Sequence, residues 1–238
     1  MFSIDGVAGG KSILAAVLAG ILCLDRVFFQ VMVSRPIIVS AVLGAVLGDL
    51  PTALVMGALI EILWADHLPV GVYIPPNDSL MSAVAVGSTI LAGQAVGSVT
   101  KEMMAFSIVL FMPLAFLARK LDQWIIAMNG TLSDRAVASA VEGRPEDIAR
   151  CVRRDLGRTL VIYVGFIIVF LFMGTVVLLK AYPLLSGKIP MKALLILFWS
   201  LPLVGIAAVL NAVRQKGVAP LFTGVFFMAV LLGTLLSS

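Results

Sequence analysis

Residues 36–64 read PIIVSAVLGAVLGDLPTALVMGALIEILW, an apolar run that is interrupted once, at its middle, by GDLP at positions 48–51. A helix that crosses a membrane needs about 20 mostly apolar residues, because each residue rises about 1.5 Å through about 30 Å of hydrocarbon. Neither half of the run reaches that length. Backbone that is not helical is tolerated at membrane depth only where protein buries it or water reaches it. The stretch therefore predicts a broken or re-entrant helical hairpin.

The composition of the 238-residue chain indicates a lipid environment around this hairpin. Apolar residues make up 61% of the chain and charged residues 13%, whereas a soluble domain has about half and about a quarter. We therefore predict an all-α, polytopic integral membrane protein with about six or more transmembrane helices. The conventional spans are expected at 12–30, 79–99, 103–117, 159–179, 191–213 and 218–236.

Charge is concentrated in one stretch, because 14 of the 30 charged residues lie within 119–158. We expect this stretch to be a polar loop with its own helices between two membrane regions, 1–118 and 159–238. Gly143 is placed to end one helix, and Pro145 suits the first position of an amphipathic, interfacial helix. Eight of the seventeen basic residues lie here, which predicts a cytoplasmic location. The loop is either a connector that sets topology or a docking surface for a soluble partner.

Small residues recur within the expected span 79–99. Gly93 and Gly97 form a G-x-x-x-G pattern, and Gly87 and Ser88 precede them. Small side chains let helix backbones approach closely in lipid, where no hydrophobic force drives helices together. The pattern favours helix packing over a role in a pore.

The residues that usually carry catalysis are scarce. The chain has one histidine, His67, and two cysteines, Cys23 and Cys151, which together give neither metal-site spacing nor a histidine relay. An intramembrane hydrolase would need a serine or a pair of carboxylates on facing helices, and the sequence shows no such pairing. We therefore expect no catalytic residue, no metal and no cofactor.

Ionisable side chains within membrane segments are costly, so each one is a candidate site. Asp25 interrupts the first expected span and is followed by Gln30. Asp25 is either part of a binding site or a counter-charge for Arg35, which precedes Pro36. Asp49, at the break in the hairpin, is expected to cap the second half-helix.

Glu61 lies inside an apolar helix, three residues before Trp64. A proline-rich segment that ends at Asn77 follows them. Carboxylate and amide groups hydrogen-bond hydroxyls, and an indole face covers a pyranose ring, so these residues form a plausible sugar site. The alternative is a buried carboxylate that is paired with helix amides or with a lysine elsewhere.

These residues also carry a resemblance to a known family. The chain resembles the integral-membrane IIC subunit of the mannose/fructose/sorbose-type phosphotransferase sugar transport system. The matching positions are Asp25, Gln30, Arg35-Pro36, Gly48-Asp49-Leu50, Gly57, Glu61, Trp64, Pro69, Pro75-Pro76-Asn77, Ala140, Glu142, Gly143 and Ile148. The similarity covers most of the chain and is strongest from Asp25 to Asn77.

The resemblance implies a multi-pass protein of the bacterial inner membrane that carries a hexose across the lipid bilayer while the sugar is phosphorylated on the cytoplasmic face. It implies a hetero-oligomer with a IID membrane subunit and with soluble IIA and IIB phosphocarrier proteins, and no nucleic-acid partner. The IIC chain of the family holds no phosphorylated residue of its own. The resemblance makes Gln30, Glu61 and Asn77 the hydroxyl-binding groups and adds Asp25 and Trp64 to the substrate site.

Two positions depart from the pattern of the family. Gly57-Ala58 stands where relatives usually have two glycines, and Ser34 stands where they frequently have a histidine. Asp66-His67 also stands where relatives commonly have small or apolar residues. The departures at Ser34, Ala58 and His67 give weight to an alternative function, a membrane scaffold or regulatory subunit of the same fold that has lost transport.

Overall fold

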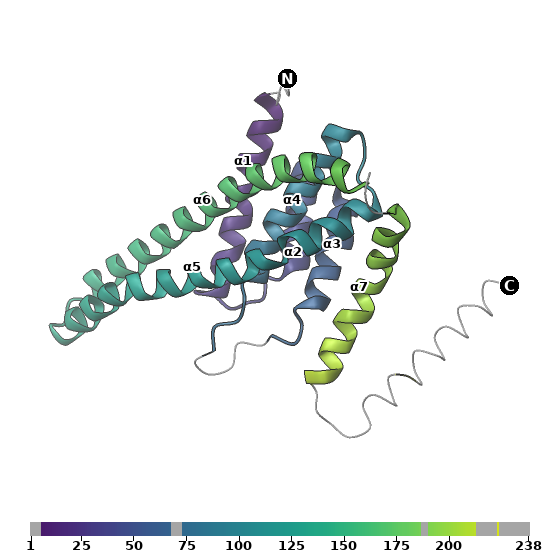
Figure 1. The fold of residues 1–238 in the computed structure, drawn as a ribbon. Helices are drawn as coiled ribbons and strands as arrows, with labels where there is room; N and C mark the ends of the chain where they lie inside the picture. The colour runs from purple at the N-terminus through teal and green to yellow at the C-terminus, as the bar shows by residue number, and fades with distance from the viewer. Residues whose placement is uncertain (1–5, 68–72, 187–189, 213–222, 224–238) are drawn as a thin grey trace.

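The computed structural model describes residues 6–67, 73–186, 190–212 and 223, and this part of the chain is helical without a strand (Figure 1). The helices are α1 (Gly6–Cys23), the short 3-10 helix η1 (Leu24–Arg26), α2 (Pro36–Leu47), α3 (Leu50–Leu63), α4 (Asp78–Val96), α5 (Lys101–Val141), α6 (Pro145–Ser186) and α7 (Met191–Ala212). Four of the described helices, α4 to α7, are long and apolar enough to cross a membrane. The prediction of an all-α polytopic membrane protein is therefore confirmed.

The broken hairpin is present as α2 and α3, which have 12 and 14 residues. Gly48 ends α2 with a φ of 88°, a left-handed conformation that glycine adopts without steric cost. The Asp49 carboxylate accepts a hydrogen bond from the amide of Thr52 at 3.2 Å, so the predicted cap is confirmed. A Cβ atom on Gly57 would lie 2.7 Å from the Cβ of Ser40, which shows how closely the two half-helices pack.

Helix α4 lies at the centre of the bundle, with α1, α2, α3, α5 and α6 packed around it (Figure 1). Fourteen of its nineteen residues are buried. Small residues allow this packing: Gly87 faces Leu171 of α6, and Ser88 donates a hydrogen bond to the carbonyl of Leu171 at 3.1 Å. The two glycines of the G-x-x-x-G pattern serve the end of the helix instead: a Cβ atom on Gly93 would overlap the side chain of Val99 in the connection to α5, and Gly97 ends α4 with a φ of 114°.

Gly174 of α6 offers a direct test of this close approach. A Cβ atom there would lie 2.5 Å from the Ser88 hydroxyl and 2.7 Å from the ring of Phe111. We expect Gly174→Val to lower the free energy of unfolding by about 1–3 kcal/mol through overpacking, measured by thermal unfolding of the purified protein in detergent. Gly165→Val is the matched control, because Gly165 lies on the same helix with no atom within 4 Å. Equal losses in both variants would contradict the packing argument.

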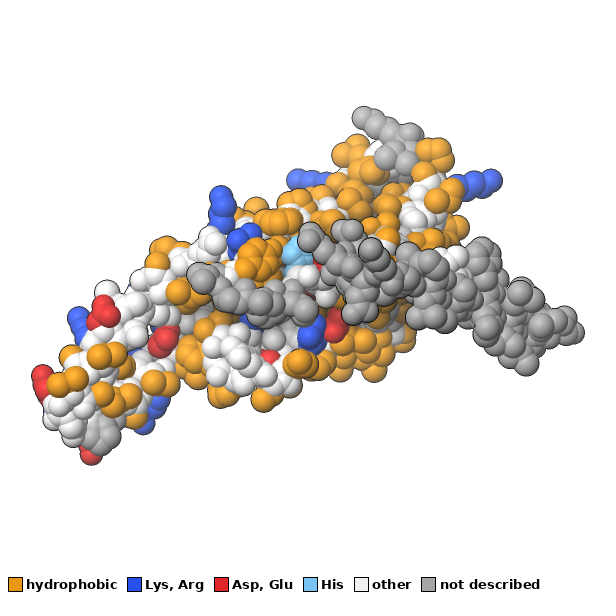
Figure 2. Space-filling model, turned by 90° about the horizontal axis from the view of Figure 1, so that it is seen from below, with side chains coloured by type: hydrophobic (Ala, Val, Ile, Leu, Met, Phe, Trp, Pro, Cys, Tyr) orange, Lys and Arg blue, Asp and Glu red, His pale blue; other side chains and the backbone are white. Residues whose placement is uncertain are grey.

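Helices α5 and α6 form a long hairpin that extends away from the other helices (Figure 1). The stretch 119–158 contains helices on both sides of a short turn, as expected, but they are the ends of two long helices: α5 continues to Val141 and α6 begins at Pro145. The predicted helix end at Gly143 is confirmed by its φ of 70°. Figure 2 shows hydrophobic side chains over most of the body and charged side chains gathered at the end of this hairpin.

The reason for the continuous helices is a seam of buried side chains between them. Ile125, Leu132 and Ser139 of α5 are buried at seven-residue intervals, which is the spacing that keeps one face of a helix against a partner helix. Across the seam, Asn129 donates a hydrogen bond to Asp155 of α6. Both helices run through the expected boundaries at 118 and 158, and the division of the chain at those positions stays a prediction.

The first expected span, 12–30, is too long, because α1 ends at Cys23 and only η1 follows it. The chain folds back there because the Asp25 side chain binds backbone amides that lie further along. The expected span 218–236 and residues 68–72, which begin the proline-rich segment, lie outside the described residues.

Candidate functional site

Asp25 organises the loop 27–35, which joins η1 to α2. Its buried carboxylate accepts hydrogen bonds from the amide of Val31 at 2.7 Å and from the amide and hydroxyl of Ser34 at 3.2 and 3.1 Å. Ser34 therefore supports the loop at the position where relatives often have a histidine. Asp25 is held by these groups, whereas Arg35 is paired elsewhere, so the expected Asp25–Arg35 neutralisation is not what the structure shows.

Gln30 is one of two residues in this loop, with Met32, that have a positive φ. Its φ is 55°, and its amide donates to the carbonyl of Asp25 at 2.7 Å. A left-handed conformation is uncommon for a residue with a side chain, and such strain persists only where the surrounding structure enforces it. The side chain of Gln30 is exposed, so the loop presents its amide outward.

Arg26 connects the end of α1 to the segment that precedes α4. Its guanidinium donates to the Asp78 carboxylate at 2.6 Å and to the carbonyls of Pro76 and Pro75 at 2.8 and 3.2 Å. Sequence reasoning did not identify this pair, although an arginine and an aspartate in apolar surroundings are expected to find partners. The contact fixes the proline-rich segment against the loop that Asp25 organises.

Asn77 caps α4 from a fully buried position. Its side-chain oxygen accepts from the amide of Leu80 at 2.9 Å, and its side-chain nitrogen donates to both oxygens of Asp122 at 2.9 and 3.2 Å. The hydroxyl of Tyr163 donates to the same carboxylate at 2.8 Å. Sequence reasoning missed Asp122 and Tyr163; the signal for Tyr163 was a phenol in an apolar span, which needs a partner when buried.

Glu61 lies against the first turn of α2. Its Oε2 accepts a hydrogen bond from the amide of Ile37 at 3.1 Å, and its Oε1 lies 3.9 Å from a guanidinium nitrogen of Arg35. The second distance is too long for a hydrogen bond. The Glu61 side chain keeps 27% of its surface exposed. A helix amide is thus a partner of Glu61, as one alternative stated, and the nearby cation is an arginine rather than a lysine. The side chain is only partly buried.

Trp64 ends α3 one turn after Glu61. Its ring is buried between His67 and Phe116, whose centroids lie 5.1 and 5.6 Å away, both edge-on. The indole nitrogen is buried and has no hydrogen-bond partner among the described residues, and the same holds for the hydroxyl of Ser40 in α2. Buried polar groups normally have partners, so an unpartnered indole calls for an explanation.

The structure therefore divides the predicted site residues into two groups. Asp25 and Asn77 have their polar side-chain atoms engaged by protein groups, and Arg26 links the segments that carry them. Glu61 and Trp64 lie three residues apart at the end of α3. The Glu61 side chain is partly exposed, and the indole nitrogen of Trp64 is buried without a hydrogen-bond partner among the described residues. The loop 27–35 joins the two groups: Asp25 holds its first part, and Arg35 at its end lies beside Glu61. Gln30 is exposed on this loop. This arrangement can bind hydroxyl groups.

Two curated relatives match part of the chain. The N-acetylgalactosamine permease IIC component 1 of Escherichia coli (strain K12) is 39% identical over 77 residues, which are 31% of this chain and 29% of that protein. The fructose permease IIC component of Bacillus subtilis (strain 168) is 28% identical over 85 residues, 36% of this chain and 32% of that protein. The chain thus matches about a third of the length of these relatives.

Two solved structures share the fold over the whole chain. One, described as a membrane protein, has a TM-score of 0.69 and 19% sequence identity, and the match covers 100% of this chain and 95% of that one. The other is a cryoEM structure of the mannose transporter ManYZ in complex with microcin E492, with a TM-score of 0.59, 22% identity and coverage of 99% of this chain and 95% of that one. The model of the family described as the sorbose-specific IIC component of the PTS matches residues 10–237. The chain therefore belongs to this family of phosphotransferase-system IIC components, multi-pass proteins of the bacterial inner membrane, and the resemblance is confirmed.

Proposed function

We propose that this chain is the sugar-translocating subunit of a phosphoenolpyruvate-dependent phosphotransferase system. It carries a hexose across the inner membrane, and a partner subunit phosphorylates the sugar on the cytoplasmic face. A IID membrane subunit and soluble IIA and IIB phosphocarriers complete the system, and this chain holds no phosphorylated residue. Membership of the IIC family supports the proposal, as do the names of the relatives, which are permeases of an amino sugar and of fructose.

The observation that carries the proposal is the partly exposed carboxylate of Glu61 near the end of α3, the second short helix of the broken hairpin. In a transporter, interrupted helices mark the position of the substrate. Oε2 of Glu61 is held by the amide of Ile37, and Oε1 is free to accept from a sugar hydroxyl. The positive end of the α2 dipole and the Arg35 guanidinium group orient the carboxylate at the first turn of α2.

We assign two kinds of role to the site residues. Glu61 contacts the sugar through Oε1, Gln30 contacts it from the loop 27–35, and Trp64 lies beside Glu61 with a buried indole nitrogen that has no acceptor among the described residues. Asp25 and Asn77 are positioning residues in this proposal, because their hydrogen bonds are directed to the protein. They fix the two segments that flank the site.

Reconstitution in a bacterial strain without hexose phosphotransferases tests the function. The chain is expressed with its cognate IID, IIA and IIB subunits, and uptake and phosphorylation of radiolabelled hexoses are measured. We expect phosphorylated sugar to accumulate only when this chain is present. Insertion of the chain with no uptake of any hexose tested would instead favour the transport-inactive scaffold.

A further inference from the structure

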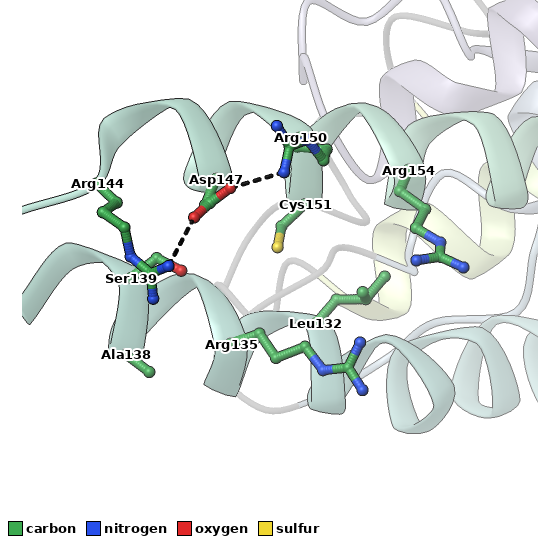
Figure 3. A pocket seen from close by; sticks show the side chains of 9 residues that line it. All are labelled: Leu132, Arg135, Ala138, Ser139, Arg144, Asp147, Arg150, Cys151 and Arg154. Carbon is green, nitrogen blue, oxygen red and sulfur yellow. Dashed lines mark hydrogen bonds and ion pairs between the residues drawn. The ribbon is translucent and has the colours of Figure 1, made fainter. Parts of the chain in front are cut away.

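The end of the long α5–α6 hairpin carries an open cavity of about 330 Å³ that is lined by several arginine side chains (Figure 3). Its lining side chains are Leu132, Arg135, Ala138 and Ser139 of α5 and Arg144, Asp147, Arg150, Cys151 and Arg154 of the turn and α6. Four of these residues are arginines and one is an aspartate, and Arg144 also pairs with Glu142, which does not line the cavity. The cavity lies far along the hairpin from Glu61 and takes no part in the proposed sugar site.

The single carboxylate is already engaged. Asp147 is paired with Arg144 at 3.5 Å and with Arg150 at 2.8 Å. Arg135 and Arg154 have no ion pair or hydrogen bond within the part of the chain that the structure describes. Figure 3 shows them on opposite walls, Arg135 on α5 and Arg154 on α6, with the Arg154 guanidinium group beside the space between the helices.

We propose that this cavity binds a phosphomonoester dianion between Arg135 and Arg154. A guanidinium group presents a planar fork of donors that matches phosphate oxygens, and two such forks from opposite walls suit a group with three terminal oxygens. The two negative charges of a dianion also match the two positive charges of Arg135 and Arg154, the lining guanidinium groups that have no ion pair among the described residues. The aliphatic wall of Leu132 and Ala138 leaves room for the organic part of the ester.

The phosphomonoester has two possible sources, a free phosphorylated metabolite and the headgroup of an anionic lipid such as phosphatidic acid. The chemistry at the two arginines is the same in both cases. The experiment therefore includes one arm for each source, and the full-length protein is used in both.

Cys151 supplies a local readout, because it lines the cavity and is partly exposed whereas Cys23 is buried. The rate of maleimide modification of Cys151 is measured in phosphatidylcholine nanodiscs with increasing inorganic phosphate or glycerol phosphate, and separately in nanodiscs that also contain phosphatidic acid. We expect one of these probes to slow modification about fivefold or more. We expect the Arg135→Gln/Arg154→Gln double variant to need at least about tenfold more of that probe for the same protection of Cys151, because it loses the charge-assisted hydrogen bonds of both guanidinium groups.

The matched control is the Lys120→Gln/Arg153→Gln double variant. It removes the same charge from the same two helices, at exposed positions that do not line the cavity. Protection by the free phosphates supports a metabolite as the source, and protection only by phosphatidic acid supports a lipid headgroup. The proposal is overturned if no probe slows modification, or if the control variant loses protection as fully as the arginine variant.

Discussion

Glu61→Gln is expected to reduce sugar uptake by about tenfold to a hundredfold while the protein still inserts and folds. A glutamine has the same shape, and its side-chain oxygen still accepts from the amide of Ile37. What it loses is the charge that strengthens a hydrogen bond from a sugar hydroxyl and that faces Arg35 across 3.9 Å. A hydrogen bond to a charged group contributes about 1.5–3 kcal/mol, which corresponds to this range in affinity.

Uptake of the radiolabelled hexose in vesicles that contain the partner subunits measures this effect, with membrane insertion checked in the same vesicles. The matched control is Asp49→Asn, which makes the same carboxylate-to-amide change at the other end of the hairpin. Asparagine caps a helix about as well as aspartate, so Asp49→Asn is expected to transport normally. Uptake by Glu61→Gln at the wild-type rate would remove Glu61 from the proposed site.

The hairpin could be predicted from sequence because its determinants are local. Gly48 supplies the left-handed turn and Asp49 the cap, and both signals lie within a few residues of the break. The same holds for the turn at Gly143. The continuity of α5 was missed because charge density was taken as the sign of a loop, whereas the seam of Ile125 and Leu132 against α6 decides the structure.

The candidate site was predictable only in part, for a physical reason. Asn77 stood out as a polar residue in an irregular segment, but its partner Asp122 lies 45 residues away and the partner of Asp122, Tyr163, a further 41. Such pairs form through the tertiary packing of α4, α5 and α6, and no spacing in one sequence indicates them. The resemblance to the IIC family identified Glu61 and Trp64, whereas the unpartnered indole nitrogen became visible only in the structure.

Asp122→Ala is expected to destabilise the protein more than any other change considered. Asp122 is 4% exposed and accepts hydrogen bonds from the side chains of Asn77 and Tyr163. Its removal leaves an amide and a phenol buried without an acceptor, at about 1–3 kcal/mol each, so we expect the free energy of unfolding to fall by about 3–5 kcal/mol. Asp122→Asn keeps one acceptor for Tyr163 and is expected to lose less.

Thermal unfolding in detergent measures the stability of both variants. Asp122→Asn still tests the buried hydrogen-bond network if Asp122→Ala does not accumulate in the membrane. Asp134→Ala is the matched control, because Asp134 is exposed on the same helix and is expected to change the free energy of unfolding by less than about 0.5 kcal/mol. If both Asp122 variants unfold like the control, the buried network does not hold α4 against α5 and α6. In that case the positioning role proposed for Asn77 is wrong. A loss of uptake in Asn77→Ala at unchanged stability would then indicate that the Asn77 amide contacts the sugar directly.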